Sequence, residues 1–277
     1  MQLRSVSQTT LLPHSITLPP PLKWAGGKRW LIPTLAPIWK RHSERRLVEP
    51  FAGGLAVALG LRPTFALLND NNPHLVNFYR WLKQGKVPDP GVSMEHDAKA
   101  YYAHRKRFND LILGGRANTL EAASLFYYLN RTAYNGLCRF SAIGIFNVPF
   151  GRYRTINYAS KNDFSVYIEA LKGWEFSNRH FRELVLEPDD FVYADPPYDV
   201  EFRSYSAGGF SWDEQKELAQ WLSAHPGPVV ASNQATNRVI ELYTDLGFHI
   251  RTLEGPRRIS CTGDRSPALE MLASKRV

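Results

Sequence analysis

The chain has 277 residues, 44% of them apolar and 13% aromatic, so it can bury a large core as one domain or as a domain with an insertion. Its net charge of +8 and isoelectric point near 9.5 favour a polyanionic partner, and nucleic acid is the first candidate. Its two distant cysteines, Cys138 and Cys261, exclude a disulfide framework and a four-cysteine zinc site, so we expect a reducing compartment and no metal centre.

Residues 1–21 are expected to form a loose, flexible tail. They contain one basic residue, Arg4, and Pro13, His14 and Pro19 interrupt their apolar runs, so we expect no secretory signal. No run in the chain approaches the ~18 apolar residues that a membrane span needs. We therefore expect no membrane partner and a cytoplasmic protein.

After the tail, the hydrophobic periodicity predicts helices that alternate with strands. The first block contains a helix at 28–40, a strand at 46–48, a helix after Gly54 and a strand at 65–68. The second block contains a strand that ends at Ala194, a helix at 213–223, a strand at 228–232, a helix at 237–243 and a strand at 248–253. This order predicts an α/β fold whose parallel sheet binds ligands at its carboxyl edge.

Between the two blocks, residues 81–158 follow a different pattern. The stretches AYYAHRKRFNDLI and TLEAASLFYYLNRT predict amphipathic helices, and LCRFSAIGIFNVPFGRYR predicts a hairpin that turns at Gly144. We interpret this segment as an insertion and expect the aromatic helix SLFYYLN to serve core packing.

Two glycines separate a short apolar strand from a helix in RLVEPFAGGLAVALGL. Gly53 and Gly54 would let a ligand approach amides at the helix start, although a plain tight turn is the alternative. Asp70 follows Gly53 by 17 residues (70 − 53), where an acid can accept hydrogen bonds from a ribose. The alternative is that Asp70 caps the helix that begins near Pro73. The spacing of the glycines disfavours NAD.

The stretch VYADPPY places an acid, two prolines and a tyrosine after an apolar strand. Pro196 and Pro197 fix two φ angles, so a stiff loop is expected, and an ordinary turn is the alternative. Tyr198 offers a ring face to a planar base, while Asp195 and the Pro196 carbonyl can accept the hydrogens of an amino group. Such a base has to leave the duplex stack, and an aromatic ring partly offsets that cost.

Four stretches in this order, LKWAGGKRWLIP, VEPFAGGLAVAL, NRTAYNGLCRFSAIGIFNVPFGRY and VYADPPY, resemble the Dam-type, alpha-group DNA adenine-N6 methyltransferases. The resemblance covers Leu22 to the C-terminus, with further similarity in VVASNQAT and RRISCTGDRSPALEMLA. It implies a Rossmann-like sheet that binds S-adenosylmethionine and carries an inserted helical and β-hairpin target-recognition domain. The implied division is a catalytic domain at 22–80 and 159–277 and a target-recognition domain at 81–158.

The resemblance also implies an activity and its residues. The activity is site-specific methylation of adenine N6 in duplex DNA after base flipping, with GATC as the suggested target and a cognate restriction endonuclease as a candidate partner. The implied catalytic residues are Asp195, Pro196, Pro197 and Tyr198. The implied cofactor-binding residues are Trp24, Lys28, Glu49, Pro50, Phe51, Gly53, Gly54, Asp70, Phe181 and Asp195. The implied DNA-binding residues are Lys23, Tyr134, Asn135, Leu137, Arg139, Pro149, Arg152 and Tyr153.

Alternatives remain open for parts of this interpretation. For Lys23 and Lys28 the alternative is a solvated loop. Arg131, Arg152 and Arg154 suit phosphate contacts. Rival functions are methylation of cytosine N4 or of RNA adenine, and a DNA-binding module without activity. Two departures weaken the resemblance. His180 stands where relatives carry an acid beside the adenine of the cofactor, and Ile145 stands where close relatives carry a charge.

Overall fold

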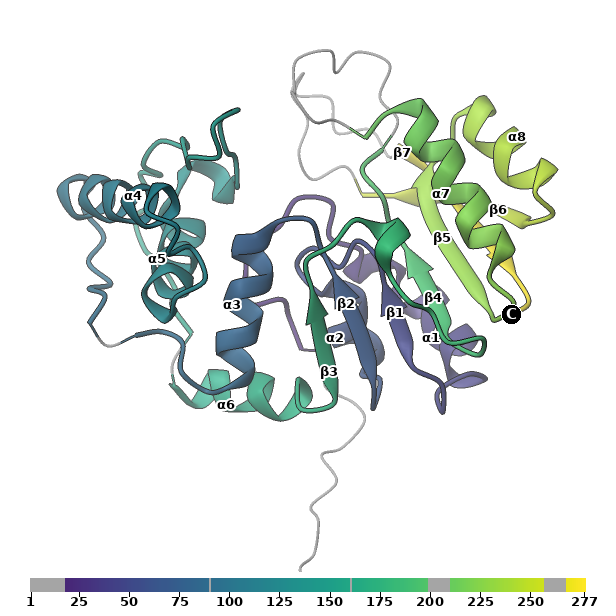
Figure 1. Ribbon diagram of the computed structural model, residues 1–277, viewed down its shortest axis with the longest axis horizontal. Coiled ribbons are helices and arrows are strands. Elements are labelled where there is room, and N and C mark those ends of the chain that lie inside the picture. Colours follow the sequence, from purple (N-terminus) through teal and green to yellow (C-terminus); the bar gives the residue numbers. More distant parts are fainter. Residues whose placement is uncertain (1–17, 90, 160, 199–209, 257–267) are drawn as a thin grey trace, which may run out of the picture.

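The computed structural model describes residues 18–89, 91–159, 161–198, 210–256 and 268–277. Its centre is a seven-stranded sheet with the strand order β3-β2-β1-β4-β5-β7-β6, shown in Figure 1. The first five strands in this order are parallel, and β7 runs antiparallel to both β5 and β6. The strands are β1 (Leu47–Glu49), β2 (Ala66–Asn69), β3 (Trp174–Ser177), β4 (Phe191–Ala194), β5 (Val229–Gln234), β6 (His249–Gly255) and β7 (Ala268–Lys275).

Helices cover both faces of the sheet, so its central strands are buried on both sides. Alternate residues separate into two cores: Leu47 and Tyr193 join the first, whereas Val48 and Ala194 join the second. The first core includes residues of α1 (Ile32–Lys40), α2 (Ala56–Leu61) and α3 (Pro73–Lys83). The second includes residues of α7 (Trp212–Ala224) and α8 (Asn237–Asp245).

Four further elements lie in the connections of this fold. They are the 3-10 helices η1 (Arg29–Leu31), η2 (Tyr134–Gly136) and η3 (Phe181–Glu183), and the helix α6 (Lys161–Ala170). Among the helices in the described ranges, none combines the length and the hydrophobicity needed to cross a bilayer.

The segment between α3 and α6 adds no strand to the sheet in its described part, as expected of an insertion. It contains α4 (Ala98–Leu113) and α5 (Leu120–Thr132), which lie to one side of the sheet in Figure 1. Residues 124–130 of α5 are all buried, which confirms the expectation of core packing for the aromatic helix. Tyr127 and Phe78 of α3 stack with ring centroids 5.8 Å apart, so the core of the insertion continues into that of the sheet.

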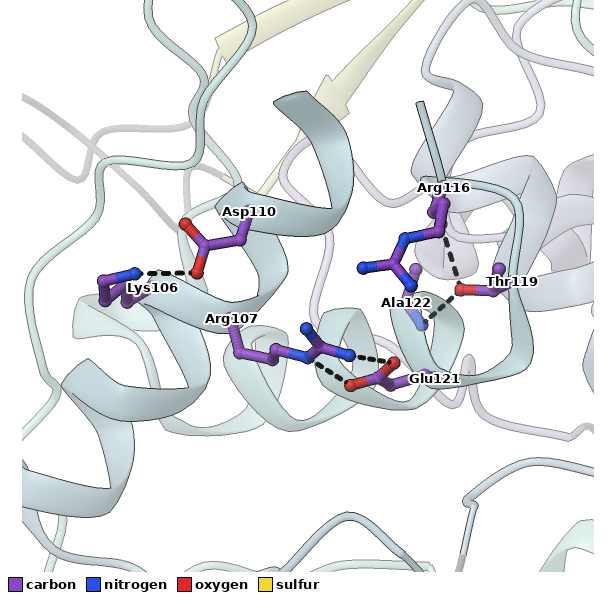
Figure 2. Close-up of polar contacts among 7 residues, drawn as sticks. All are labelled: Lys106, Arg107, Asp110, Arg116, Thr119, Glu121 and Ala122. Carbon is purple, nitrogen blue, oxygen red and sulfur yellow. Dashed lines mark hydrogen bonds and ion pairs between the residues drawn. The ribbon is translucent and has the colours of Figure 1, made fainter. Parts of the chain in front are cut away.

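Polar contacts hold α4 against α5 at the solvent side, as Figure 2 shows. Arg107 forms two parallel hydrogen bonds with the Glu121 carboxylate, at 2.5 and 2.8 Å, and this fork geometry suits a guanidinium. Thr119 caps α5 by accepting from the Ala122 amide, and its hydroxyl donates to the Arg116 carbonyl. The loop between the helices is therefore tied to the start of α5.

The expected hairpin is present as a short, irregular one. Gly144 has a φ of +78° and its amide donates to the Ser141 carbonyl, which confirms the predicted turn. Two isolated antiparallel bridges, Ala133 to Phe150 and Phe140 to Phe146, take the place of continuous strands.

All helices and strands predicted from the sequence are confirmed, with ends that differ by a few residues. The strands β3 and β7 and the helix α6 were not predicted. Residues 1–17 of the expected tail lie outside the described residues, and so does RRISCTGDRSP at 257–267. The end of the tail packs on the fold: Pro21 is buried, and the Tyr167 hydroxyl donates to the Pro19 carbonyl at 2.6 Å.

Candidate active site at the carboxyl edge of the sheet

The candidate site lies where the strand order reverses, between β1 and β4. From β1 the order proceeds to β2 and β3 on one side and to β4 and β5 on the other. Crossover connections diverge at such a point and leave a crevice outside the carboxyl ends of the strands. Glu49, Asn69 and Ala194 are the last residues of β1, β2 and β4, so the segments that follow them share this edge.

The glycine turn after β1 is built around Trp24 and Asp70. Gly53 has a φ of +48°, and its amide donates to the Asp70 carboxylate at 2.9 Å. A Cβ atom at Gly53 would lie 2.9 Å from Trp24 Nε1, and one at Gly54 would lie 2.8 Å from Trp24 Cβ. The absence of both side chains therefore lets the indole pack directly on the turn.

Asp70 is not the cap of α3, so that alternative is wrong. Asn72 occupies the cap position and accepts hydrogen bonds from the amides of His74 and Leu75. Asp70 instead accepts from the amides of Gly53 and Asn72. Burial raises the pKa of Asp70, and these two hydrogen bonds oppose the rise.

Glu49 is a buried acid without a donor for one of its oxygens. Its side chain is 2% exposed, and none of the residues that the structure describes donates a hydrogen bond to its Oε1 atom. Burial raises the pKa of this carboxyl well above its usual range, and the negative charge of Asp195 adds to the rise. An acceptor of this kind is stabilised by a cationic or hydrogen-bond-donating ligand. Oε1 of Glu49 is therefore a buried acceptor atom of the site that lacks a hydrogen-bond donor among the described residues.

Asp195 is held in place by two donors from different elements. Lys28 Nζ lies 3.0 Å from Oδ2, and Ser232 Oγ of β5 donates to Oδ1 at 2.9 Å. The hydrogen on Ser232 Oγ points to Asp195, so the Tyr193 hydroxyl must donate to Ser232 across their 2.8 Å contact. Burial raises the pKa of Asp195, while Lys28 and Ser232 oppose that rise. Lys28 itself is 4% exposed, so the alternative that it belongs to a solvated loop is wrong.

The rest of the Asp-Pro-Pro-Tyr loop is fixed by long side chains. Gln215 of α7 donates to the Pro197 carbonyl at 2.8 Å, and Asn233 of β5 donates to Gln215 at 3.0 Å. The Tyr198 hydroxyl donates to the Glu270 carboxylate of β7, and the Lys28 ammonium lies 4.7 Å from the centroid of the Tyr198 ring. These bonds add to the restraint that the two prolines place on the backbone of the loop.

A cluster of aromatic side chains lies beside the glycine turn, at the carboxyl edge of the sheet. The ring of Phe51 lies 5.9 Å from that of Phe181 and 5.5 Å from that of Phe210. His180 packs on Phe181 with centroids 4.4 Å apart, and its Nδ1 accepts from the Arg182 amide at 3.3 Å. Its Nε2 points to Glu214, 4.0 Å away. His180, one of the two departures from the family pattern, thus lies beside Phe181 of the candidate cofactor site.

A second group of candidate residues surrounds a hollow in the insertion. The hollow has a volume of about 300 Å³, and its lining consists of Tyr134, Asn135, Phe150, Gly151, Arg152 and Tyr153. The Tyr134 side chain is 52% exposed, and Arg152 is exposed. Lys23 joins this group, because its ammonium lies 4.0 Å from the centroid of the Tyr153 ring and donates to the Arg131 carbonyl.

The remaining candidates for DNA binding lie along the hairpin. Arg139 is exposed, and its guanidinium donates to the side chain of Asn147 at 2.7 Å. Pro149 is exposed and accepts from the Tyr134 amide, whereas Leu137 is partly buried against the core. The insertion therefore exposes several of the candidate DNA-binding side chains to solvent, namely Tyr134, Arg139, Pro149 and Arg152.

A family model, described as the D12 class N6 adenine-specific DNA methyltransferases, matches residues 24–259. The chain belongs to this family. Curated relatives include the retron Ec67 DNA adenine methylase of Escherichia coli, which is 33% identical over 91% of this chain and 90% of its own. The DNA adenine methylase of Escherichia coli K12 is 32% identical over 91% and 93% of the two chains. The type II methyltransferase M1.LlaDCHI of Lactococcus lactis is 31% identical over 85% and 88%.

Membership confirms the family that the four stretches indicated and makes this D12 class protein an adenine-specific DNA methyltransferase. Four residues of the site were missed by the sequence interpretation. Ser232 and Gln215 lie in the predicted strand 228–232 and the predicted helix 213–223, but nothing there marked them. Tyr193 reads as an ordinary strand residue, and Glu270 belongs to an unpredicted strand.

Proposed function

We propose that this enzyme transfers a methyl group from S-adenosylmethionine to the N6 atom of an adenine that has been flipped out of duplex DNA. The observation that carries the proposal is the convergence of two features at one switch point. One is the glycine turn with Trp24, Asp70 and Glu49, whose Oε1 atom lacks a donor among the described residues. The other is the Asp195 carboxylate, which Lys28 and Ser232 hold at the end of the neighbouring strand.

The residues of the turn fit S-adenosylmethionine. This cofactor carries a sulfonium and an ammonium, and one oxygen of the buried Glu49 carboxylate lacks a donating partner among the described residues. Asp70 keeps the position after β2 that suits a ribose, and Trp24, Phe51 and Phe181 offer apolar surface. We assign five further residues to the same pocket: Lys28, Pro50, Gly53, Gly54 and Asp195. When bound, S-adenosylmethionine supplies an electrophilic methyl carbon on its sulfur.

Catalysis would depend on orientation of the target amine. Asp195 accepts one N6 hydrogen and the Pro196 carbonyl accepts the other, which frees the nitrogen lone pair from conjugation with the ring. Tyr198 stacks on the base and Pro197 keeps the loop stiff, with its carbonyl fixed by Gln215. Burial raises the pKa of Asp195, and the nearby Lys28 ammonium opposes that rise by favouring the ionised form. As the N6–C bond forms, the bond between the methyl carbon and the sulfonium sulfur would break and leave its electron pair on a neutral thioether. The amine becomes acidic and would release one proton to water along its hydrogen bond to Asp195.

The insertion is proposed to bind and read the DNA. In this division residues 22–80 and 159–277 form the catalytic domain, residues 81–158 form the target-recognition domain and residues 1–21 a tail. Arg139 suits guanine in the major groove, and Leu137 or Tyr134 suits the gap left by a flipped base. Lys23, Asn135, Pro149, Arg152 and Tyr153 complete the proposed contact surface. The suggested target is GATC. Because the substrate is DNA, we expect the enzyme in the cytoplasm, with a restriction endonuclease of the same specificity as a candidate partner.

The test replaces Asp195 by alanine and compares it with Asp189→Ala, which makes the same change near the amino end of β4, where the side chain is exposed. We expect Asp195→Ala to reduce methyl transfer by at least about a hundredfold. DNA affinity should stay within a few-fold, and Asp189→Ala should behave like the wild type. Labelled methyl donor and mass spectrometry of the digested DNA measure the product. Recovery of N4-methylcytosine, or transfer to RNA alone, would support the rival substrates, and turnover by Asp195→Ala near the wild-type rate would refute the assignment.

A further inference from the structure

The active-site edge contains an acid that no part of the mechanism above uses. Glu270 is the third residue of β7, and its carboxylate accepts a hydrogen bond from the Tyr198 hydroxyl. Because β7 runs antiparallel to β5, the first residues of β7 lie at the edge where β4 and β5 end. Glu270 pairs with Gln234, the last residue of β5. The antiparallel direction of β7 therefore places the Glu270 carboxylate next to the Asp-Pro-Pro-Tyr loop.

The stem of Glu270 occupies space that the neighbouring strand leaves open. A Cβ atom on Gly255, the last residue of β6, would lie 2.7 Å from Glu270 Cγ and 3.0 Å from Cζ2 of Trp30. Gly255 is buried, so the Glu270 side chain packs between this glycine and the tyrosine. A side chain confined in this way has little freedom to lose when it forms a hydrogen bond.

Among the described residues, Lys28 contacts the face of the Tyr198 ring and Glu270 contacts its hydroxyl. The loop bonds from Gln215 hold the Pro197 carbonyl, which precedes the tyrosine and leaves its χ angles undetermined. Lys28 lies over the ring face, but its ammonium also contacts Asp195 and the Gly26 carbonyl. The hydroxyl contact with Glu270 fixes the far end of the ring axis. A phenolic O–H prefers to lie in the plane of its ring, so the direction of this hydrogen bond also restrains rotation of the ring about that axis.

We propose that Glu270 is a positioning residue, which holds the Tyr198 ring in the plane on which the flipped adenine stacks. This inference rests on the proposed function, since it assigns Tyr198 the base as its partner. Glu270 does not touch the reacting atoms and acts through the tyrosine. Loss of the acceptor leaves the ring able to rotate, so the base is held less often in the orientation that reacts.

The test is a double-mutant cycle with Glu270→Leu and Tyr198→Phe. Phenylalanine keeps the stacking ring and removes the hydroxyl. We expect each single variant to lower the single-turnover rate of methyl transfer by about tenfold, as expected for loss of a hydrogen bond to a charged group. The double variant should be no slower than Tyr198→Phe, because both changes remove one contact. Glu270→Gln keeps an acceptor oxygen and should restore most of the rate.

Two further readouts separate positioning from general damage to the fold. A duplex with 2-aminopurine at the target position reports stacking of the flipped base, and Glu270→Leu and Tyr198→Phe should weaken its quenching to the same degree. Affinity for S-adenosylmethionine and the melting temperature should match those of Glu254→Leu. This control removes an exposed acid from the neighbouring strand β6.

The inference would be overturned by multiplicative rate losses in the double variant, or by normal turnover and quenching in Glu270→Leu. If Glu270→Leu does not fold, the comparison of Glu270→Gln with Tyr198→Phe decides the question. If the wild type bound DNA but transferred no methyl group to adenine, the proposed function would fail. The quenching arm would still decide whether Glu270 controls Tyr198.

Discussion

Gly53 meets two demands that no other residue type satisfies together. Its φ of +48° lies in the left-handed region, and its missing side chain lets Trp24 approach the turn. Its amide is also one of the two that hold the Asp70 carboxylate. Gly53 therefore determines two properties of the candidate cofactor pocket: how closely Trp24 packs on the turn, and where the Asp70 carboxylate is held.

Gly53→Ala should therefore disturb the pocket as well as the backbone. The left-handed φ costs about 1 kcal/mol of stability for alanine, and the clash with Trp24 Nε1 at 2.9 Å should displace the indole and weaken binding of S-adenosylmethionine at least tenfold. Calorimetric titration and thermal unfolding measure the two effects. Gly115→Ala is the matched control, because Gly115 has a φ of +70° with nothing within 4 Å of a Cβ atom. It should lose similar stability and bind the cofactor normally. Equal cofactor affinity in both variants would argue against the role of Trp24.

At the scale of elements, the sequence predicted what short-range patterns encode. The strands before Pro50 and Asp195 and the helix after Gly54 follow from apolar runs and from glycine and proline signals. The strand β7 could not be predicted in the same way. Its alternation is interrupted by buried Met271, Leu272 and Ala273, because it lies inside the sheet and is covered on both faces. Glu270 was missed for the same reason, since its role depends on a pairing between strands far apart in sequence.

The helix α3 carries a buried histidine whose titration should be visible in stability. His74 stacks on Phe140 and also contacts Phe108, and its Nδ1 has no hydrogen-bond partner. Burial lowers its pKa from 6.5 to about 4, so the folded state favours the neutral ring. Between pH 6.5 and about 4, His74 binds a proton in the unfolded chain but stays neutral in the folded chain. Stability present above that pH is lost as the pH falls towards 4.

His74→Phe should remove this part of the pH dependence. The variant keeps an aromatic ring in the same cluster and carries no titratable group. Between pH 6.5 and 4 we expect the wild type to lose roughly 3 kcal/mol more than the variant, from a shift of this size at 1.36 kcal/mol per pH unit. Urea unfolding at several pH values measures the difference. His249→Phe, at an exposed histidine of β6, should leave the pH profile unchanged. Parallel profiles for the wild type and His74→Phe would contradict the assignment.

Across the whole molecule, the net charge is positive, whereas the candidate active site is rich in acids. The chain carries a net charge of +8, yet its candidate active site contains the acids Glu49, Asp70, Asp195 and Glu270, of which the last two lie near Lys28. A positive exterior attracts the phosphates of DNA over a distance, and an acidic pocket favours a cationic cofactor. The composition predicts the first property. The second required the fold, because these acids come from four different strand ends.

Sequence discrimination belongs to the same scale, because it needs the insertion and the catalytic edge to act on one duplex. Arg139→Ala should cost about 1–3 kcal/mol of discrimination, since an arginine can form two bonds with a guanine edge. Methylation rates on a panel of duplexes with single base changes measure this. Asn147→Ala controls for the hydrogen bond that Arg139 forms within the hairpin. Arg154→Ala, which removes an exposed candidate phosphate contact, should weaken binding to all sequences alike and reduce the salt dependence of binding. If Arg139→Ala kept the wild-type preference across the panel, another residue would have to read the base.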